Sequence, residues 1–453
     1  MLMSLAQLAH QIGAEYRGND LPFSGVSIDS RSMNPGELFV AIKGEHFDGH
    51  LYVEKAIASG AAAVMVDHPL VVNVPQIIVR DTTVGLGKLA QAWRLQFHVP
   101  VIALTGSCGK TGTKEMIASI LRQRGNTLAT VGNKNNFYGL PLTLLQLRSE
   151  HQFAVIEMGT NHVGEIAYLT DITRPTVALV TNIRASHLEG FGSFEALSNE
   201  KSDIFKGLSA GGIAVINHDE KFARTWQEKV DVRHRVSFGL HTPSDVSATN
   251  AHFGSAGATF DLHTPLGDAV VTVPLLGEHV LYNALAAAAA TLAVGADLAQ
   301  VVKGLAMVEA VTGRFKPYRL ADDVLLIDDT YNASASSVQN AIQTLSHHSG
   351  KKIFVMSNMG ELGNFSGEFH RKMGEWALTA HIDQLFLTGN YTMLEATIDA
   401  CPSARYFADK QTLIHALQAE LTPKTMVVIK GSRSNRMEEV VNALVPNLTE
   451  ELH

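Results

Sequence analysis

The chain has 453 residues, and because a hydrophobic core stops growing near about 250–300 residues, this length indicates about three domains. Hydrophobic residues make up 46% and charged residues 18%, an ordinary globular mixture that excludes a disordered, collagen-like or low-complexity chain. The net charge of −8 leaves no broad basic surface for nucleic acid or an anionic membrane, and two cysteines exclude a disulfide scaffold.

The N-terminal segment has no basic leader before an apolar stretch, so it does not resemble a secretory signal. The most apolar segment, Ala284 to Ala296, is shorter than the roughly 20 residues that a membrane-spanning helix needs. No group of Cys and His residues has the spacing of a zinc site. We therefore expect a cytoplasmic protein without a membrane span.

In residues 1–98, short strand-like runs alternate with helical patterns, which predicts a small α/β domain. The expected elements are helices at Ser4–Gln11, Tyr52–Ser59 and Gly85–Phe97, and strands at Leu38–Ile42, Ala63–Val66 and Gln76–Val79. Residues Gly85–Ala90 fit the loose dinucleotide fingerprint G-x-G-x-x-A, but no acidic residue follows at the required distance. We interpret this segment as the start of a helix.

Residues 99–312 predict a doubly wound P-loop domain with parallel strands, because their apolar runs are short and continuous. The runs are Val101–Leu104, Phe153–Ile156, Val177–Val180 and Ile213–Ile216. An amphipathic helix is expected at Lys114–Arg124, and an alanine-rich helix at Tyr282–Val294 stops at Gly295. Between them, Arg233–Val273 predicts β-hairpins on one edge of the sheet.

Residues 313–453 predict a third, Rossmann-like α/β domain. Its expected strands are Val324–Ile327, Ile353–Met356, Gln384–Leu387 and Met426–Ile429, with helical stretches between them. The chain is therefore predicted to be an α/β protein of three domains.

The most specific local motif is a glycine-rich loop between an apolar strand and an amphipathic helix. Such a loop directs backbone N–H groups and the positive end of a helix at a nucleotide polyphosphate. Lys110 is expected to contact the β- and γ-phosphates, and the Thr111 hydroxyl to ligate Mg²⁺. Leu104 occupies the position of the first motif glycine, so this is a shortened variant. The loop residues are Thr105, Gly106, Ser107, Cys108, Gly109, Lys110, Thr111 and Gly112.

Polar residues follow two of the predicted strands, where open α/β sheets bind ligands. Glu157 follows Phe153–Ile156, Asn182 follows Val177–Val180, and His187 lies five residues further on. On residue type alone, Glu157 reads as a cap and His187 as a loop histidine, and magnesium's preference for oxygen counts against His187.

Eight segments spread over the chain together resemble one family, the Mur ligases, which are ATP-dependent enzymes of bacterial peptidoglycan precursor synthesis. They are TGSCGKTGTKE, NKNNFYGLPLTLL, VIEMGTNHVGEI, TNIRASHLEGFGSFEALSNEKSDIF, LLGEHVLYNALAAAAA, TGRF, DDTYNAS and IKGSRSNRMEEV, in that order. The early segment IDSRSMNPGELFVAIKGEHFDGH resembles the uridine-nucleotide domain of these enzymes.

This resemblance implies a uridine-nucleotide domain, a central ATPase domain and a C-terminal domain that closes over both, with hinges near 98–100 and 311–320. It implies ligation of D-alanyl-D-alanine to UDP-MurNAc-tripeptide through an acyl phosphate, with ATP converted to ADP and phosphate. These two small molecules are the expected partners of a monomeric enzyme that binds no nucleic acid.

The resemblance also implies a catalytic set of Lys110, Glu157, His187 and Lys201. Thr111 and Glu157 are expected to ligate one Mg²⁺ and His187 a second one. Lys201 is expected to carry a carbamate that helps to hold a metal. Without the resemblance, Lys201 reads as an exposed helix lysine.

Further contacts follow from the same resemblance. Expected ATP contacts are Asn283, Arg314 and Asp328. Expected substrate contacts are Ser30, Arg31, Lys43, Asn135, Asn136, Tyr331 and Asn332. For the polar residues among them, solvated loop positions are the alternative interpretation.

Three positions depart from the family pattern. Ser334 replaces an asparagine, Asn358 replaces an aspartate and cannot act as a carboxylate, and Cys108 lies in the phosphate loop, where a helix N-terminus lowers a thiol pKa.

Four alternative functions are open to test. The tripeptide-forming Mur ligase usually carries an Asp-Asn-Pro-Arg motif, which this chain lacks, and folylpolyglutamate synthase lacks the first region. A nucleotide-dependent regulatory protein need not retain the catalytic residues. A switch GTPase needs Asn-Lys-x-Asp, whereas Asn133–Asn136 ends in an amide.

Overall fold

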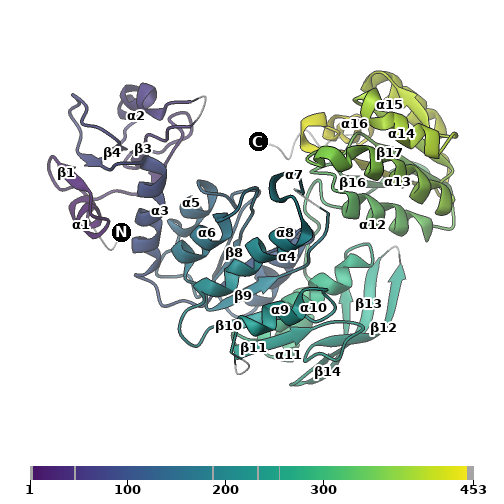
Figure 1. The fold of residues 1–453 in the computed structure, drawn as a ribbon, viewed down its shortest axis with the longest axis horizontal. Coiled ribbons are helices and arrows are strands. Elements are labelled where there is room, and N and C mark those ends of the chain that lie inside the picture. The colour runs from purple at the N-terminus through teal and green to yellow at the C-terminus, as the bar shows by residue number, and fades with distance from the viewer. Residues whose placement is uncertain (1–3, 45–46, 186–187, 232–233, 255, 446–453) are drawn as a thin grey trace.

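The computed structural model describes residues 4–44, 47–185, 188–231, 234–254 and 256–445. Within these ranges the strands form four sheets, three of them flanked by helices as predicted for an α/β chain. Figure 1 shows the N-terminal sheet at one end, the central sheet in the middle and the C-terminal sheet beside the latter. No helix in the described ranges is long and apolar enough to cross a membrane.

The N-terminal sheet has the order β1-β5-β4-β3-β2, and only its edge strand β1 runs antiparallel to its neighbour. Its strands are β1 (Glu15–Arg17), β2 (Val26–Ser27), β3 (Leu38–Val40), β4 (Ala63–Val66) and β5 (Gln76–Ile78). Its helices are α1 (Leu5–Gln11), the 3₁₀ turn η1 (Gly49–Tyr52) and α2 (Val53–Ala58). Ser4 begins α1 as a capping box with Gln7, the pattern that fixes a helix start.

Helix α3 (Thr82–Arg94) joins the N-terminal domain to the central one. It begins earlier than predicted because the Asp81 carboxylate accepts hydrogen bonds from the N–H groups of Thr83 and Val84. The buried Arg94 side chain donates to carbonyls of both the 97–99 segment and the end of α6 (Glu165–Thr173), including Thr173 at 3.1 Å. These bonds brace the segment in which the first hinge is predicted.

Gly87 lies inside α3, next to Tyr168 of α6 (Glu165–Thr173). A Cβ at this position would lie 2.0 Å from the Tyr168 hydroxyl oxygen, so a side chain cannot be accommodated without movement. The glycines of the apparent dinucleotide fingerprint therefore serve helix packing in this fold.

The central sheet is parallel throughout and has the order β11-β10-β9-β6-β8-β7. Its strands are β6 (Val101–Thr105), β7 (Thr127–Ala129), β8 (Phe153–Glu157), β9 (Val177–Val180), β10 (Ile213–Asn217) and β11 (Arg235–Phe238). Alternate residues of β6 enter two different cores, with Val101 and Ala103 on one face and Ile102 and Leu104 on the other. Burial on both faces explains the continuous apolar runs of its sequence.

Helices cover both faces of this sheet. One face carries α5 (Gly139–Leu144), α6, α8 (Phe194–Ser202) and α9 (Ala223–Glu228), and the other carries α4 (Lys110–Arg122), α10 (His279–Leu292) and α11 (Leu298–Ala306). Two short elements, α7 (Leu188–Phe191) and η2 (Asp203–Gly207), flank α8.

The hairpins predicted between residues 233 and 273 do not form an edge of the central sheet. The edge strand is β11, which pairs in parallel with β10, and β12 (Ser247–Gly254), β13 (Gly257–Thr264) and β14 (Gly267–Val273) form a separate antiparallel sheet. The alternate residues Ala258, Phe260 and Leu262 give this sheet an apolar face of its own, which packs into the core of α10 and α11.

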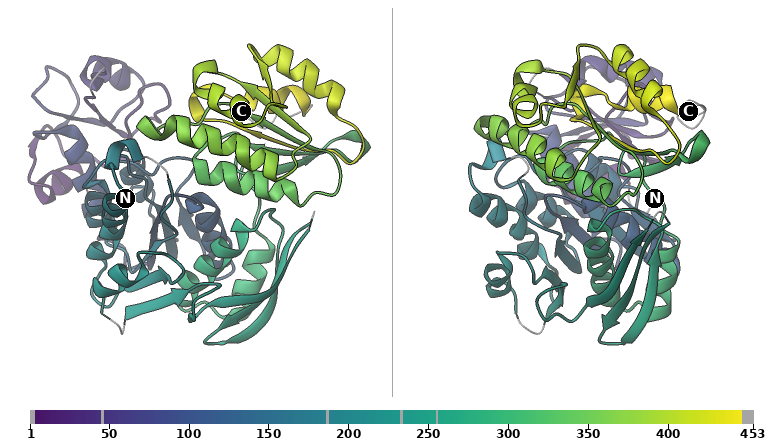
Figure 2. Two further views of the ribbon diagram at one scale, coloured as in Figure 1. Left: turned by 45° about the vertical axis from the view of Figure 1, so that its right-hand side comes forward. Right: turned by 90° about the vertical axis from the view of Figure 1, so that its right-hand side faces the viewer.

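The C-terminal sheet has the order β15-β16-β20-β17-β18-β19, with β15 antiparallel and the rest parallel. Its strands are β15 (Lys316–Arg319), β16 (Leu325–Asp329), β17 (Lys352–Met356), β18 (Gln384–Thr388), β19 (Arg405–Phe407) and β20 (Met426–Lys430). Helices α12 (Ala335–Ser346), α13 (Ser366–Thr379) and α14 (Tyr391–Ala400) cover one face, and α15 (Lys410–Glu420) and α16 (Glu438–Leu444) the other. Figure 2 shows α12 on the side that faces the central domain.

Candidate active site

A cavity of about 1120 Å³ lies between the central and C-terminal domains. The central domain contributes the phosphate loop, the carboxyl ends of β8 and β9 and the first half of α10, while the C-terminal domain contributes the 313–315 turn, the loop after β16 and the start of α12. Thirteen of the predicted site residues line it, and they are Ser107, Cys108, Gly109, Lys110, Thr111, Gly112, Asn135, Asn136, Glu157, Asn283, Arg314, Tyr331 and Asn332.

Asn182 holds the phosphate loop in place. Its side chain accepts a hydrogen bond from the Cys108 N–H and donates one to the Cys108 carbonyl, both at 3.0 Å. Its backbone carbonyl accepts from the Ser107 N–H at 2.9 Å, and the neighbouring Thr181 hydroxyl donates to the Cys108 carbonyl at 2.8 Å. The end of β9 thus fixes the loop from outside its own strand–helix unit.

Gly109 allows the phosphate loop to lie directly against Asn283 of α10. Its φ of 78° is in the left-handed region, and a Cβ there would lie 2.4 Å from the Asn283 side-chain oxygen. A residue other than glycine would therefore disturb both the loop and the residue predicted to contact ATP.

Glu157 forms an oxygen-rich cluster beside the phosphate loop. Its carboxylate accepts from the Thr111 hydroxyl at 3.0 Å and from the Asn135 amide at 2.8 Å, and its backbone N–H donates to the Thr130 hydroxyl. A carboxylate and a hydroxyl at the end of a phosphate loop are the hard oxygen ligands that Mg²⁺ prefers. These donors therefore fit the predicted metal.

The Lys110 amine lies within the phosphate loop, where it donates to the Gly106 carbonyl at 2.8 Å. Burial lowers the pKa of this amine, the positive charge of Arg314 lowers it further, and the Glu157 carboxylate acts in the opposite direction. An anionic ligand in the cavity would relieve this accumulation of positive charge.

Lys201 of α8 is fully buried, contrary to its interpretation as an exposed helix lysine. Burial lowers the pKa of its amine well below the usual value, and the nearby Lys110 charge adds to this effect. In the described part of the chain its amine forms neither a hydrogen bond nor an ion pair. The side chain does not line the cavity, but its amine is close enough to Lys110 for the two charges to interact.

The C-terminal wall of the cavity is cationic and aromatic. The Arg314 guanidinium lies 3.9 Å from the centre of the Tyr331 ring, a cation–π contact that fixes both side chains. The buried Lys430 amine contacts the Asp329 carboxylate at 2.5 Å and the Asn332 carbonyl at 2.8 Å. Lys430 thereby holds the loop that carries Tyr331.

Asp328, a predicted ATP contact, turns away from the cavity. One carboxylate oxygen accepts from the Gly313 N–H at 2.9 Å, and the other accepts from the Thr330 N–H and hydroxyl. The next residue, Asp329, lines the cavity instead.

The family departures have structural explanations. Ser334 caps α12, with its hydroxyl accepting from the Ser337 N–H, so the replacement preserves a helix start. The Asn358 oxygen accepts from the Asn390 N–H at 3.3 Å, and Asn358 lies outside the cavity. The Cys108 sulfur lies 3.1 Å from the Ser336 hydroxyl, so the phosphate loop contacts α12 directly.

Some predicted site residues of the described chain do not line the cavity. Ser30, Arg31 and Lys43 belong to the N-terminal domain and do not line the cavity, and Arg31 is exposed and paired with Asp29 at 2.7 Å. His187 lies outside the described residues. Thr105 and Gly106, the first two residues of the phosphate loop, do not line the cavity either, and the Thr105 hydroxyl donates to the Met158 carbonyl.

The sequence did not predict the structural roles of two buried charged residues near the site. Lys430 is a buried strand lysine, and Glu200 accepts from the N–H groups of Gly164 and Ile166 at 2.7 and 2.8 Å, fixing the start of α6 beside Lys201. Within a buried sheet or helix, a charged residue is the only sequence signal for such a role.

Sequence comparison identifies the family to which this chain belongs. Residues 22–94 match the Mur ligase family, catalytic domain; residues 104–291 match the Mur ligase middle domain; and residues 313–433 match the Mur ligase, glutamate ligase domain. The chain belongs to the Mur ligase family. A Mur ligase of Escherichia coli K12, UDP-N-acetylmuramoyl-tripeptide–D-alanyl-D-alanine ligase, is 45% identical over 450 residues, covering 99% of both chains. The enzyme of the same name from Haemophilus influenzae is 38% identical, with 98% of both chains covered.

Solved Mur ligase structures agree with this assignment. MurF from Acinetobacter baumannii superposes with a TM-score of 0.90 at 35% identity, covering 97% of this chain and 98% of its own. MurF from Thermotoga maritima, solved in complex with ADP, gives a TM-score of 0.84 at 29% identity and covers 96% and 100%.

Proposed function

We propose that this Mur ligase joins D-alanyl-D-alanine to UDP-MurNAc-tripeptide, forming UDP-MurNAc-pentapeptide, ADP and phosphate. The observation that carries the proposal is the single interdomain cavity that unites the phosphate loop, the Glu157 cluster and the Arg314–Tyr331 pair. Its support from relatives is the full-length identity to enzymes of that name.

The reaction needs an activated carboxylate, because a carboxylate is a poor electrophile. The tripeptide carboxylate attacks the γ-phosphorus of ATP, forming an acyl phosphate and releasing ADP. The free amine of D-alanyl-D-alanine then attacks the acyl carbon, loses a proton, and expels phosphate. Negative charge accumulates at both steps, so cationic and N–H groups should supply most of the stabilisation.

The phosphate loop binds and orients the ATP phosphates in this proposal. Lys110 neutralises the transferring phosphoryl group, and Asn182, which accepts from the Cys108 N–H, fixes the loop so that its remaining N–H groups can bind the phosphates. Arg314 holds the phosphates from the C-terminal side, and Asn283 contacts the adenine.

Thr111 and Glu157 would hold Mg²⁺, and His187 a second ion, on the family pattern. When bound, the metal neutralises phosphate charge and polarises the transferring group. The 3.0 Å separation of the two oxygen donors supports the first of these assignments.

Carbamylation of Lys201 is the second element of the proposal. A neutral amine attacks carbon dioxide, forming an N–C bond and releasing one proton, and the product is an anionic carbamate. The buried, unpaired amine with its lowered pKa is in the form required for this reaction. Carbon-13 NMR with labelled bicarbonate should give a carbamate signal that is absent in Lys201→Met.

Ser30, Arg31 and Lys43 are proposed to contact the UDP-MurNAc part of the substrate, and Asn135, Asn136, Tyr331 and Asn332 its peptide or the incoming dipeptide. A monomeric state and a cytoplasmic location stay predictions. The two hinges also stay predictions, although the Arg94 bonds favour movement at 311–320 over movement at 98–100.

The test is phosphate release from ATP with UDP-MurNAc-tripeptide, with and without D-alanyl-D-alanine. We expect release to require both substrates, to match the amide product in amount, and to be lost in Lys110→Ala but kept in Lys303→Ala, an exposed lysine of α11. Product from UDP-MurNAc-dipeptide and a free diamino acid would instead indicate the tripeptide-forming ligase. ATP binding without turnover would favour the regulatory function.

A further inference from the structure

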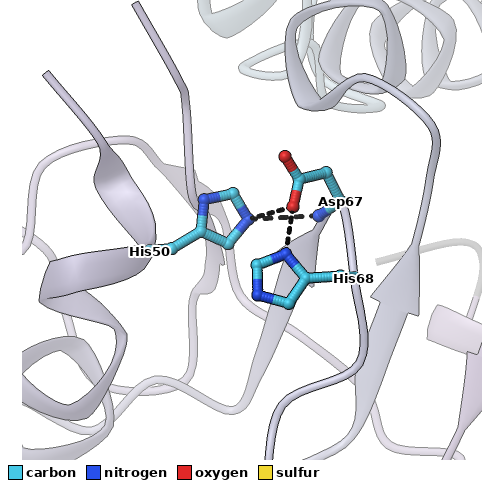
Figure 3. Close-up of side chains that lie close together, drawn as sticks. All are labelled: His50, Asp67 and His68. Carbon is cyan, nitrogen blue, oxygen red and sulfur yellow. Dashed lines mark hydrogen bonds and ion pairs between the residues drawn. The ribbon is translucent and has the colours of Figure 1, made fainter. Parts of the chain in front are cut away.

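A cluster of two histidines and one aspartate lies in the N-terminal domain, outside the active-site cavity. His50 comes from η1, while Asp67 and His68 directly follow β4 (Figure 3). Their ligand atoms all lie within 4.8 Å of one another. The two contributing segments are far apart in sequence, which explains why spacing along the chain predicts no zinc site.

The hydrogen bonds of His50 fix which of its nitrogens carries the proton. Its Nδ1 lies 2.7 Å from the Asp48 carboxylate, which can only accept, so Nδ1 is the N–H donor. Its Nε2 accepts from the Asp67 backbone N–H at 3.1 Å, which requires a lone pair on that atom. A histidine oriented by a carboxylate on its far nitrogen is the usual arrangement of a metal ligand.

A lone pair on Nε2 leaves an unfavourable contact. The Asp67 carboxylate oxygen Oδ1 lies 3.1 Å from the same Nε2, so a cation, either a proton or a metal ion, is needed between these two atoms. Oδ1 is also in close contact with His68 Nδ1. A cation shared by these three atoms would convert the repulsive contact into attraction.

The rings of His50 and His68 support a common occupant. Their centroids lie 5.0 Å apart with an interplanar angle of 22°, and His50 Nε2 and His68 Nδ1 both contact the Asp67 oxygen Oδ1. Zinc binds imidazole nitrogen and carboxylate oxygen at about 2.0–2.2 Å, so tetrahedral ligand atoms lie about 3.4 Å apart. Because an ion lies in the plane of each imidazole that binds it, the two near-parallel rings must rotate relative to each other to share one ion, and the His68 side chain, which is 60% exposed, can make this rotation.

We propose that His50, Asp67 and His68 bind a divalent transition-metal ion of the zinc type. Two imidazole nitrogens with one carboxylate favour such an ion over Mg²⁺ or Ca²⁺, which prefer oxygen. On binding, the metal takes the Nε2 lone pair from the Asp67 N–H, and the Asp48 carboxylate holds the ring in place. The ion links η1 to the end of β4, and therefore stabilises the N-terminal domain independently of the ligase reaction.

The exposure of the cluster makes the test practicable. The His68 side chain is 60% exposed, so its removal should not unfold the domain, whereas the His50 side chain is 7% exposed. The probe is Zn²⁺ in equilibrium dialysis with the full chain, free of any histidine tag, in excess Mg²⁺ to occupy oxygen sites. Bound zinc is counted per chain by elemental analysis.

We expect the wild-type protein to bind one zinc ion more per chain than His68→Ala. Asp48→Asn should weaken this binding about 10–100-fold, as loss of an orienting partner does. His415→Ala, an exposed histidine of α15, should bind as the wild type does. Cobalt should give a visible absorption spectrum that is absent in His68→Ala, and zinc should raise the melting temperature of the wild type and of His415→Ala but not of His68→Ala.

Equal zinc binding by wild type and His68→Ala would overturn the proposal, as would the absence of binding in both. Either result would mean that a proton, and not a metal ion, lies between the Asp67 carboxylate and His50. The experiment measures metal binding and not ligase activity, so a negative result would refute the metal site without bearing on the proposed function.

Discussion

The hydrogen bonds between Asn182 and the phosphate loop predict a large and specific loss of ATP affinity in Asn182→Ala. The variant removes the acceptor for the Cys108 N–H and one of the two donors to the Cys108 carbonyl. Thr181 still donates to that carbonyl, so the N–H is the group left without its protein partner. An unsatisfied donor of this kind costs about 1–3 kcal/mol. If the bound loop alone bears this cost, ATP affinity falls about 5- to 150-fold.

The assay is the dissociation constant of ATP by equilibrium titration, with thermal unfolding measured on the same samples. Asn126→Ala is the matched control, because Asn126 is an exposed asparagine of the same domain whose side chain lies outside the cavity. Thr181→Val should weaken ATP less than Asn182→Ala, since it leaves the Cys108 N–H partnered. A dissociation constant within twofold of the wild type for Asn182→Ala would refute the reasoning.

Three further perturbations test packing and electrostatics. Gly87→Ala should lower the free energy of unfolding by about 1–3 kcal/mol, because the new methyl group clashes with the Tyr168 hydroxyl. Adding Tyr168→Phe to this variant should recover part of the loss, since the buried Tyr168 hydroxyl has no hydrogen-bond partner among the described residues. Lys430→Met should cost about 3 kcal/mol in chemical denaturation, because the largely buried Asp329 carboxylate loses its cation. In buffers free of carbon dioxide, wild-type stability should rise with pH above the lowered folded-state pKa of Lys201 and level off at about 10.4, the pKa of the unfolded chain. Between these two pKa values the unfolded chain protonates Lys201, whereas burial keeps the amine neutral in the folded state. Lys201→Met should flatten this rise.

Each of these perturbations has a control. Gly367→Ala, in α13 with open space around its Cβ, should be neutral or stabilising. Lys410→Met removes an exposed ion pair with Glu439 and should cost no more than about 1 kcal/mol. Lys206→Met, an exposed lysine, should leave the pH dependence unchanged. A control that matched its partner variant would contradict the corresponding explanation.

The parallel core of the central domain was predictable because burial on both faces imposes continuous apolar runs. The runs at β6, β8, β9 and β10 were each identified to within one residue at the end of the strand. Shorter strands such as β7 and β19 were missed, since three residues of mixed polarity carry no clear period.

Part of the candidate site was predictable for the same reason. Parallel strands bring their carboxyl ends to one edge, so Glu157 at the end of β8 meets Thr111 after β6. The sequence did not predict which of two adjacent aspartates faces the cavity. Side chains alternate between the two faces of a strand, and tertiary packing decides which alternate set lies on which face. Asp329 pairs with Lys430 because β16 and β20 are neighbours in register, which only the sheet order reveals.

Oxygen tracing tests most directly whether an acyl phosphate forms from the tripeptide carboxylate. UDP-MurNAc-tripeptide labelled with ¹⁸O in its terminal carboxylate is incubated with ATP and D-alanyl-D-alanine, and the phosphate released is examined by mass spectrometry. The mechanism predicts one labelled oxygen in each phosphate, because the oxygen that attacks the γ-phosphorus leaves with it. Unlabelled phosphate accompanying full amide formation would contradict the account.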